Sequence, residues 1–311
     1  MTERDLPEVV SQASNGAPGS PPEVVAEDQT EYCFGHPDTP TRLHCTRCDK
    51  AICGRCAVSA SVGQHCVWCV AEAKKSAPKV RSTMQAGSPA VFAIIGINVA
   101  MYLLETFFPV VLQRFSEQPA AIANGEYWRL FTAMFLHAPL GARFGIFHIL
   151  FNMYILRIYG PNVEEAFGKA RFVGMYLIAG LGGGTLSYLL SNCAVSGVGA
   201  SGAIFGVVGI LLVYLYRRRT SSFVAAYQRS LMTFVGINLL FGFLVPGIDN
   251  YAHIGGLVAG MALGAGLDAG PAGNVSRGRE VMTILGVLGI IGAVIIFRTA
   301  TMPIGCIAFL Q

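Results

Sequence analysis

Charge is scarce in this chain. Only 13% of its 311 residues are charged, whereas 53% are hydrophobic, and the mean hydropathy is +0.54. A soluble domain carries about 25% charged residues. The composition therefore excludes an ordinary soluble domain and predicts an integral membrane protein with several apolar spans of about 20 residues. The net charge of +4 is modest, and we expect no nucleic-acid partner.

The N-terminal region lacks the apolar core of a signal peptide. It is rich in Pro, Ser, Glu and Gly instead. A segment of this composition buries too little apolar surface to offset the entropy lost on ordering, so we expect residues 1–30 to form a disordered tail.

Cysteine is absent from most of the chain and concentrated in one block. Seven of the nine cysteines fall between residues 33 and 69, and Cys193 and Cys306 stand apart. The block contains four ligand pairs with two-residue gaps: Cys33 and His36, Cys45 and Cys48, Cys53 and Cys56, and Cys66 and Cys69. Such a gap lets both side chains reach one ion, and eight ligands suffice for two tetrahedral Zn²⁺ sites. A disulfide framework is the alternative, and it requires an oxidising compartment.

This block resembles a B-box-type zinc finger, a family in which the ligand pairs alternate between two ions. The resemblance implies one Zn²⁺ site of Cys33, His36, Cys53 and Cys56, and a second of Cys45, Cys48, Cys66 and Cys69. His44 and His65 adjoin ligands and are alternatives within the second set. Because protein ligands fill every position, we expect a structural role or a protein partner rather than catalysis.

Seven apolar segments follow a basic linker at residues 73–87. Their expected limits are residues 91–112, 144–159, 172–190, 201–216, 231–245, 252–267 and 281–297. Several are shorter than a full span, so they must be buried among neighbours, or meet a thinned bilayer or a water-filled cavity.

Basic residues alternate between the connections. Thirteen Lys and Arg residues fall on the side of the linker and four on the opposite side. Cytoplasmic connections carry the excess of positive charge, so we expect a cytoplasmic N-terminus and an outer C-terminus. That orientation favours zinc over disulfides in the cysteine block.

Two residues capable of catalysis stand at the start of helices that begin on the outer side. Ser201 heads the fourth apolar segment and His253 the sixth. A serine hydroxyl becomes a strong nucleophile when a base accepts its proton, and imidazole, with a pKa of about 6.5, is suited to that role. Asp249 lies one turn before His253 and is either a helix cap, which we favour, or a third catalytic acid.

Further hydrogen-bond donors are expected at the same depth in the membrane as Ser201 and His253. His148 and Asn152 are four residues apart, so they share a helix face, and the backbone N–H of Ser201 is a further donor at a helix N-terminus. Gly-x3-Gly pairs start at Gly202 and Gly256, and small residues let helix backbones approach closely. We expect Phe205 to pack beneath the ring of His253.

Together these residues resemble the rhomboid intramembrane serine proteases. The resemblance rests on Gly199-Ala200-Ser201-Gly202, Ala252-His253-Ile254-Gly255-Gly256, His148-Ile149-Leu150-Phe151-Asn152 and Glu126-Tyr127-Trp128-Arg129, within residues 88–268. It implies a Ser201/His253 dyad without a third acid, an oxyanion hole from His148, Asn152 and the Ser201 amide, and no catalytic cofactor. It also implies cleavage of single-span membrane proteins near the outer leaflet. The connection between residues 137 and 148 is longer than is usual in this family.

We therefore predict an all-α polytopic membrane protein of the bacterial plasma membrane. A zinc-binding domain at residues 31–72 and the linker at 73–87 precede a six-helix catalytic core at 88–268. A loop and a seventh helix follow at 269–311. The alternative function is a non-catalytic adaptor that binds transmembrane helices and recruits a partner through the zinc domain. A channel or transporter is disfavoured because no inverted repeat is present.

Overall fold

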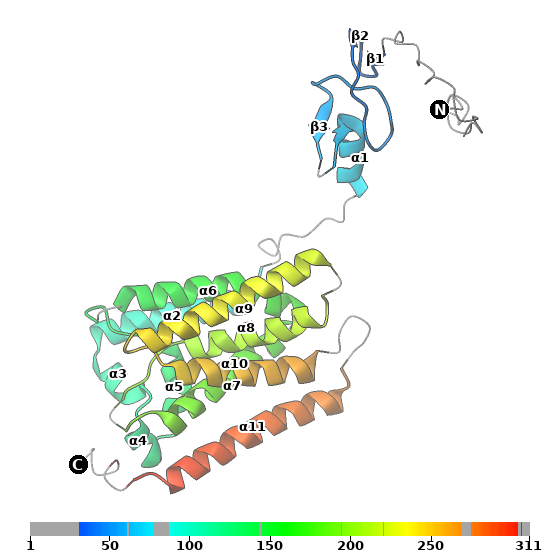
Figure 1. Ribbon diagram of the computed structural model, residues 1–311. Helices are drawn as coiled ribbons and strands as arrows, with labels where there is room; N and C mark the ends of the chain where they lie inside the picture. The colour runs from blue at the N-terminus through cyan, green and yellow to red at the C-terminus, as the bar shows by residue number, and fades with distance from the viewer. Residues whose placement is uncertain are drawn as a thin grey trace, which may run out of the picture. The chain divides into compact units, whose positions relative to one another are not determined.

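The computed structural model describes residues 31–60, 62–76, 87–142, 145–193, 195–219, 221–268, 275–303 and 306. The chain divides into two compact units at residues 1–80 and 81–311 (Figure 1). Each unit has its own core. This division falls inside the predicted linker. The predicted tail at 1–30, most of the linker and the loop at 269–274 lie outside the described residues.

The first unit consists of two small hairpins and one helix. Its elements are β1 (Tyr32–Cys33), β2 (His36–Pro40), β3 (Ala57–Ser59), β4 (Gln64–Cys66) and α1 (Val67–Ser76). β1 pairs with β2 and β3 with β4, in both cases antiparallel. Isolated two-stranded hairpins are at best marginally stable, and the buried core here is six cysteines and Ile52. The unit therefore needs a cross-link between its side chains.

The second unit is a helical bundle. Its elements are α2 (Pro89–Phe107), α3 (Val110–Phe115), α4 (Pro119–Ala123), α5 (Arg129–Thr132), the 3₁₀ helix η1 (Ala133–Phe135), α6 (Gly145–Phe167), α7 (Lys169–Leu190), α8 (Ser201–Tyr216), α9 (Ser222–Leu244), α10 (Asn250–Leu267) and α11 (Arg277–Ala300). Each predicted apolar segment contributes to one long helix. The short helices lie in the connection between α2 and α6.

Three helix boundaries differ from the sequence prediction by five residues or more. The first helix ends at Phe107, before Pro109, and α3 begins separately, because proline restricts the preceding residue and has no N–H to donate. α6 instead continues beyond residue 159 and through Pro161 to Phe167. The buried carboxylate of Glu164 on this extension accepts hydrogen bonds from the first backbone amides of α2, so tertiary contact stabilises the extra turns.

The third difference is the start of α9, which begins at Ser222 rather than residue 231. The hydroxyl of Ser221 accepts a hydrogen bond from the amide of Val224 and caps the helix.

Within the described residues, three helices are long and apolar enough to cross a membrane: α2, α7 and α11. α8 is strongly apolar but has only 16 residues. An unbroken run from Gly202 to Leu211 in α8 is buried, as we predicted for a short helix among neighbours. The prediction of seven spans stays a prediction for α6, α8, α9 and α10.

Glycines bring the backbones of α7, α8 and α10 into contact. A methyl group at Gly256 or Gly260 would overlap the carbonyl oxygens of Gly202 and Gly206 on α8. On the α7 side, the Cβ of an alanine at Gly183 would stand 2.8 Å from the carbonyl oxygen of Ala252. The predicted close approach of the fourth and sixth helices is therefore confirmed.

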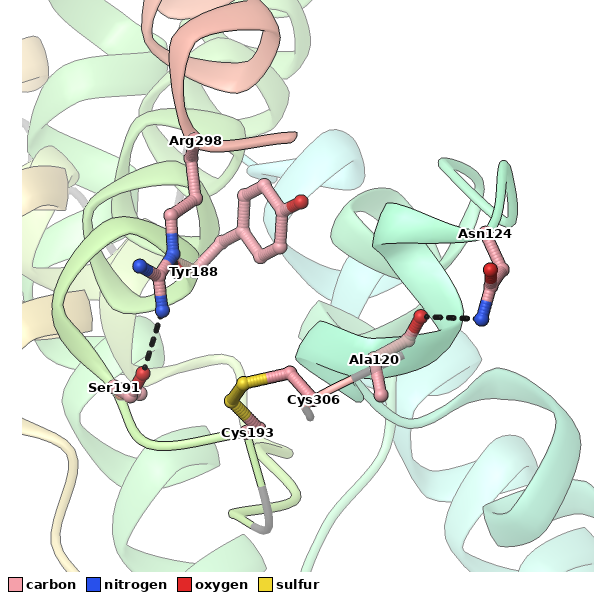
Figure 2. Close-up of a disulfide and its surroundings, with 7 residues drawn as sticks. All are labelled: Ala120, Asn124, Tyr188, Ser191, Cys193, Arg298 and Cys306. Carbon is pink, nitrogen blue, oxygen red and sulfur yellow. Dashed lines mark hydrogen bonds between the residues drawn. A yellow bond between two sulfur atoms is a disulfide. The ribbon is translucent and has the colours of Figure 1, made fainter. Parts of the chain in front are cut away.

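α11 lies beside α7 and α10 and is fastened at both ends (Figure 1). At one end, the Arg298 guanidinium donates to the carbonyls of Tyr188 and Ser191, and a disulfide joins Cys193 to Cys306 with a Cα–Cα distance of 5.6 Å (Figure 2). At the other end, Arg171 and Glu280 form two hydrogen bonds of 2.8 and 2.7 Å. The sequence alone did not indicate this disulfide.

Candidate active site and metal centres

The hydroxyl of Ser201 meets the imidazole of His253. Ser201 is the first residue of α8, and His253 lies in the first turn of α10. The Oγ–Nε2 distance is 2.9 Å, within hydrogen-bond range, and His253 is buried. Close packing of α8 against α10 therefore brings together two residues that are 52 positions apart.

Aromatic stacking determines the orientation of the His253 ring. Phe205 lies one helical turn after Ser201, and its ring stacks on that of His253 with centroids 4.3 Å apart and an interplanar angle of 6°. The predicted packing of Phe205 against His253 is confirmed.

Asp249 caps α10. One carboxylate oxygen accepts from the amide of Ala252 at 2.9 Å, and the other accepts from the hydroxyl of Ser187 at 2.6 Å. The Nδ1 of His253 has no hydrogen-bond partner among the described residues. The cap interpretation is thus confirmed, and this carboxylate is not bonded to the histidine side chain.

His148 lies beside the serine. Its Nδ1 accepts a hydrogen bond from the amide of Ala138 at 3.2 Å, so in the neutral ring Nε2 carries the hydrogen. Gly199 has a φ of +140°, and the Cβ of an alanine there would stand 3.0 Å from His148 Nε2 and 3.6 Å from Ser201 Oγ. Glycine suits this position, because a side chain would strain the backbone and crowd the ring of His148.

Asn152 is buried one turn further along α6. Its Nδ2 donates to the carbonyl of His148 at 2.9 Å, so one of the two amide hydrogens is used inside the helix. The described hydrogen bonds do not join Asn152 to Ser201.

The connection between α2 and α6 is held by Arg129. Its Nε donates to the Glu126 carboxylate at 2.6 Å, and its Nη1 donates to the carbonyls of Gln113 and Ser116 at 2.9 Å each. The side chain is almost fully buried. These contacts tie Arg129 to Glu126 and to the end of α3.

A small pocket of about 30 Å³ opens beside Ser201. Its walls include Gly180, Gly184 and Gly199, together with the carboxylates of Glu117 and Asp249. Glu117 is placed by two backbone hydrogen bonds with Gly197, of 2.9 and 2.8 Å. Sequence reasoning missed Glu117, because this long-range pairing is not indicated by any local motif.

In the first unit, the eight ligand candidates gather into two groups. Cys33, His36, Cys53 and Cys56 form one, and Cys45, Cys48, Cys66 and Cys69 form the other, with the ligand atoms of each group within 4.8 Å of one another. His36 Nδ1 lies 3.4 Å from Cys53 Sγ and 3.3 Å from Cys56 Sγ. A tetrahedron with metal–sulfur bonds of about 2.3 Å has edges of about 3.8 Å. Both groups therefore fit a tetrahedral ion, and their membership matches the predicted alternation.

The two alternative ligands lie elsewhere. His44 bonds to the carboxylate of Glu31 at 2.5 Å, and His65 lies in β4 opposite Val58. The disulfide alternative is also absent from the block, because all seven of its cysteines are free. Hydrogen bonds to the sulfurs of Cys66 and Cys48 raise the pKa of the Cys69 thiol to about 12, an effect that a bound cation would oppose.

The helical unit matches known proteins. Residues 124–269 match the family model described as "Rhomboid domain". The chain is 35% identical over 203 residues to "Rhomboid protease GluP" of Bacillus subtilis, covering 63% of this chain and 38% of that protein. It is 43% identical over 145 residues to "RHOMBOID-like protein 6, mitochondrial" of Arabidopsis thaliana, covering 46% and 44%. The chain thus spans less than half the length of these two relatives.

A shorter relative is covered almost completely. The chain is 32% identical over 180 residues to "Putative rhomboid protease YdcA" of Bacillus subtilis, which is 56% of this chain and 86% of that protein. Nearly the whole of this relative therefore aligns with the chain. This agrees with the apolar helices and with the resemblance found in the sequence. This chain belongs to the rhomboid family.

Proposed function

We propose that this chain is an intramembrane serine endopeptidase that uses Ser201 as nucleophile and His253 as general base. The observation that carries the proposal is the 2.9 Å hydrogen bond between Ser201 Oγ and His253 Nε2. A nucleophile and a base within hydrogen-bond reach are the diagnostic arrangement for covalent catalysis. Relatives named as proteases support peptide-bond hydrolysis at the level of the family.

The reaction follows from this geometry in two steps. The Ser201 hydroxyl transfers its proton to His253 Nε2 while Oγ attacks the substrate carbonyl, and the imidazolium then protonates the leaving amine. Water next gives a proton to His253 and attacks the acyl-enzyme, which releases the new carboxyl terminus and restores the Ser201 hydroxyl.

The oxyanion of both tetrahedral intermediates needs hydrogen-bond donors. His148 supplies an Nε2–H beside Gly199, and the backbone amide of Ser201 is unpaired within its helix because it belongs to the first turn. Asn152 offers its second amide hydrogen from the same face of α6. Removing one such donor costs about 10²–10³ in kcat in a serine protease.

His253 works without a third acid in this proposal. Its ring is oriented by stacking on Phe205 rather than by a carboxylate on Nδ1. Burial of both rings also keeps the base away from bulk water.

Two observations support the predicted orientation, with Ser201 near the outer leaflet. The first is the excess of basic residues on the side of the N-terminus. The second is the Cys193–Cys306 disulfide, because disulfides persist in oxidising compartments and these cysteines flank helix ends at the predicted outer side. The bacterial plasma membrane stays a prediction, since the relatives include both bacterial proteins and a plant protein named mitochondrial.

The first unit is proposed to be a structural zinc domain with two Zn²⁺ ions. Each group of four ligands has the size of a tetrahedral site, and no ligand position is left for water. A folded surface of this kind on the cytoplasmic side suits a protein partner.

Fluorophosphonate labelling tests the catalytic proposal. The purified full-length protein should react at Ser201, and Ser201→Ala should abolish the label. Incubation with a panel of tagged single-span proteins should then give cleavage products that depend on Ser201. Equal labelling of the wild type and Ser201→Ala, with no Ser201-dependent cleavage, would contradict the protease proposal and favour the non-catalytic adaptor.

A further inference from the structure

Three buried polar side chains form a group next to His148. Tyr102 and Glu105 lie on α2, and His137 follows η1 in the connection that leads to α6. Glu105 and His137 are only 1% and 0% exposed. The ring of His137 lies edge-on to the rings of Tyr102 and His148, with centroids 6.4 and 5.1 Å away. This group therefore joins α2 to the histidine that lies beside Ser201.

Glu105 is the only charged residue of α2, a helix that is long and apolar enough to cross a membrane. An ionisable side chain within such a helix is a functional hypothesis by default. Its Oε1 accepts a hydrogen bond of 2.9 Å from the backbone amide of His137, while Oε2 has no hydrogen-bond partner among the described residues. In the same part of the chain, no Lys or Arg forms an ion pair with it. A buried carboxyl group with one partner is costly, so stability does not account for Glu105.

The partner of Glu105 is next to the amide that binds His148. Glu105 accepts from the amide of His137, and the following amide, that of Ala138, donates to His148 Nδ1 at 3.2 Å. Two consecutive N–H groups thus tie one short stretch of the connection to α2 and to α6. Because the connection between residues 137 and 148 is long, its length alone does not place the Ala138 amide against the ring.

The Ala138 amide decides which nitrogen of His148 carries the hydrogen. A hydrogen bond at one ring nitrogen of a neutral histidine sets the tautomer. Since Nδ1 accepts, the hydrogen stays on Nε2, the nitrogen beside Gly199 and Ser201. A ring with its hydrogen on Nδ1 would instead present a lone pair at that place, and a lone pair repels an oxyanion.

We propose that Glu105 is a positioning residue for His148: by binding the His137 amide, it holds the Ala138 N–H on His148 Nδ1 and keeps the Nε2–H available to the oxyanion. The inference rests on the proposed protease function, in which His148 is an oxyanion donor. No described hydrogen bond joins Glu105 to Ser201, so it acts through His148. The role needs an acceptor oxygen at the right reach and does not need a negative charge.

Two substitutions separate the reach of the oxygen from the charge. Glu105→Gln keeps an oxygen that can accept from the His137 amide, and Glu105→Asp keeps the charge but withdraws the oxygen by one methylene group. The measurement is the rate at which full-length protein gains the mass of a fluorophosphonate at Ser201, with loss of fluoride. The phosphoryl oxygen of this reagent takes the place of the oxyanion. Glu105→Gln should react at nearly the wild-type rate, and Glu105→Asp more slowly.

Removal of the acceptor should have the largest effect. Glu105→Met has a similar length and offers only a weakly accepting sulfur. It should react roughly tenfold to a hundredfold more slowly than the wild type, which is at most the loss of about 10²–10³ expected when an oxyanion donor itself is removed. In a His148→Ala background, Glu105→Met should cause no further slowing, because the donor that it positions is gone.

The tautomer of His148 gives a second readout that does not depend on catalysis. The chain has six histidines, so ¹⁵N-labelling of histidine alone gives a simple spectrum, and the His148 signals are those lost in His148→Ala. Ring nitrogens with and without hydrogen are well separated in such spectra. Wild type and Glu105→Gln should show His148 with its hydrogen on Nε2, whereas Glu105→Asp and Glu105→Met should populate the other tautomer.

The outcomes separate this inference from the proposed function. A wild-type rate in Glu105→Met, with Ser201 labelled, would overturn the positioning role and leave the protease standing. Equal slowing by Glu105→Met with and without His148 would also overturn it, because a general structural defect acts in both backgrounds. Absence of labelling at Ser201 in the wild type would overturn the protease, whereas an unchanged His148 tautomer in Glu105→Asp and Glu105→Met would overturn the inference alone.

Discussion

The two units of this chain hold their folds in opposite ways. The first unit has a core made almost entirely of cysteine, and its hairpins contain only two to five residues per strand. The helical unit has a large aliphatic and aromatic core, and glycines bring its central helices together. In the proposed zinc domain, metal ligation would therefore supply the stability that so short a chain cannot obtain by burying a core.

Metal removal should give the largest difference between the two units, because only the first unit depends on metal ligands. A strong chelator should strip about two Zn²⁺ per chain and unfold only the first unit, because structural zinc contributes about 10–16 kcal/mol of apparent folding free energy in zinc-finger peptides. Thiol alkylation read by mass spectrometry should then modify the seven free cysteines and spare Cys193 and Cys306. Ser201 should still react with fluorophosphonate. Zinc-free protein with protected thiols would contradict the metal assignment.

A single added methyl group between α8 and α10 should destabilise the helical unit, although less than chelation destabilises the first unit. Gly260→Ala forces a methyl group against the carbonyl of Gly206, so α8 and α10 must separate. Overpacking of this kind costs about 1–3 kcal/mol, and thermal unfolding in detergent should show a lower midpoint with zinc content unchanged. Gly286→Ala in α11, where nothing lies within 4 Å, is the matched control. Alanine favours a helix by up to about 1 kcal/mol over glycine, so this variant should keep or slightly raise the midpoint.

The smallest expected effect concerns the orientation of the base. Phe205→Leu removes the stacking partner of His253 but keeps an apolar side chain. Aromatic pairs contribute about 0.5–1.5 kcal/mol beyond area burial, so cleavage of a transmembrane substrate should slow roughly twofold to tenfold. Phe243→Leu, at an exposed position on α9, is the control. A rate equal to wild type in Phe205→Leu would show that stacking does not orient the ring.

Local sequence patterns predicted much of both units. The two-residue gaps between cysteines identified all eight ligand candidates, because both members of a pair must lie within a few ångströms of one ion. Apolar length predicted the seven long helices, and α8 has the predicted limits, since Ser201 and Tyr216 bound an uninterrupted apolar run. Ser201 and His253 were identified by their helix starts and by resemblance to a family.

Other features depended on contacts that local patterns do not encode. α6 passes through Pro161 because Glu164 on its far side binds the first amides of α2. The Cys193–Cys306 disulfide closes 113 residues. Whether Asp249 served as a cap or as a catalytic acid was decided by its bonds to Ala252 and Ser187 rather than by its spacing from His253.

The sequence by itself determined the residue chemistry: eight candidate metal ligands in four pairs, a serine and a histidine at helix starts, and glycines at intervals of four. These are short-range patterns, and the geometry of a helix or a ligand pair follows from a few neighbouring residues. Only the tertiary structure decided which side chains share a space, including the 2.9 Å contact of Ser201 with His253 and the position of Glu117 in the same pocket. Such contacts join residues on different elements, so they are set by how closely the helices and their connections pack.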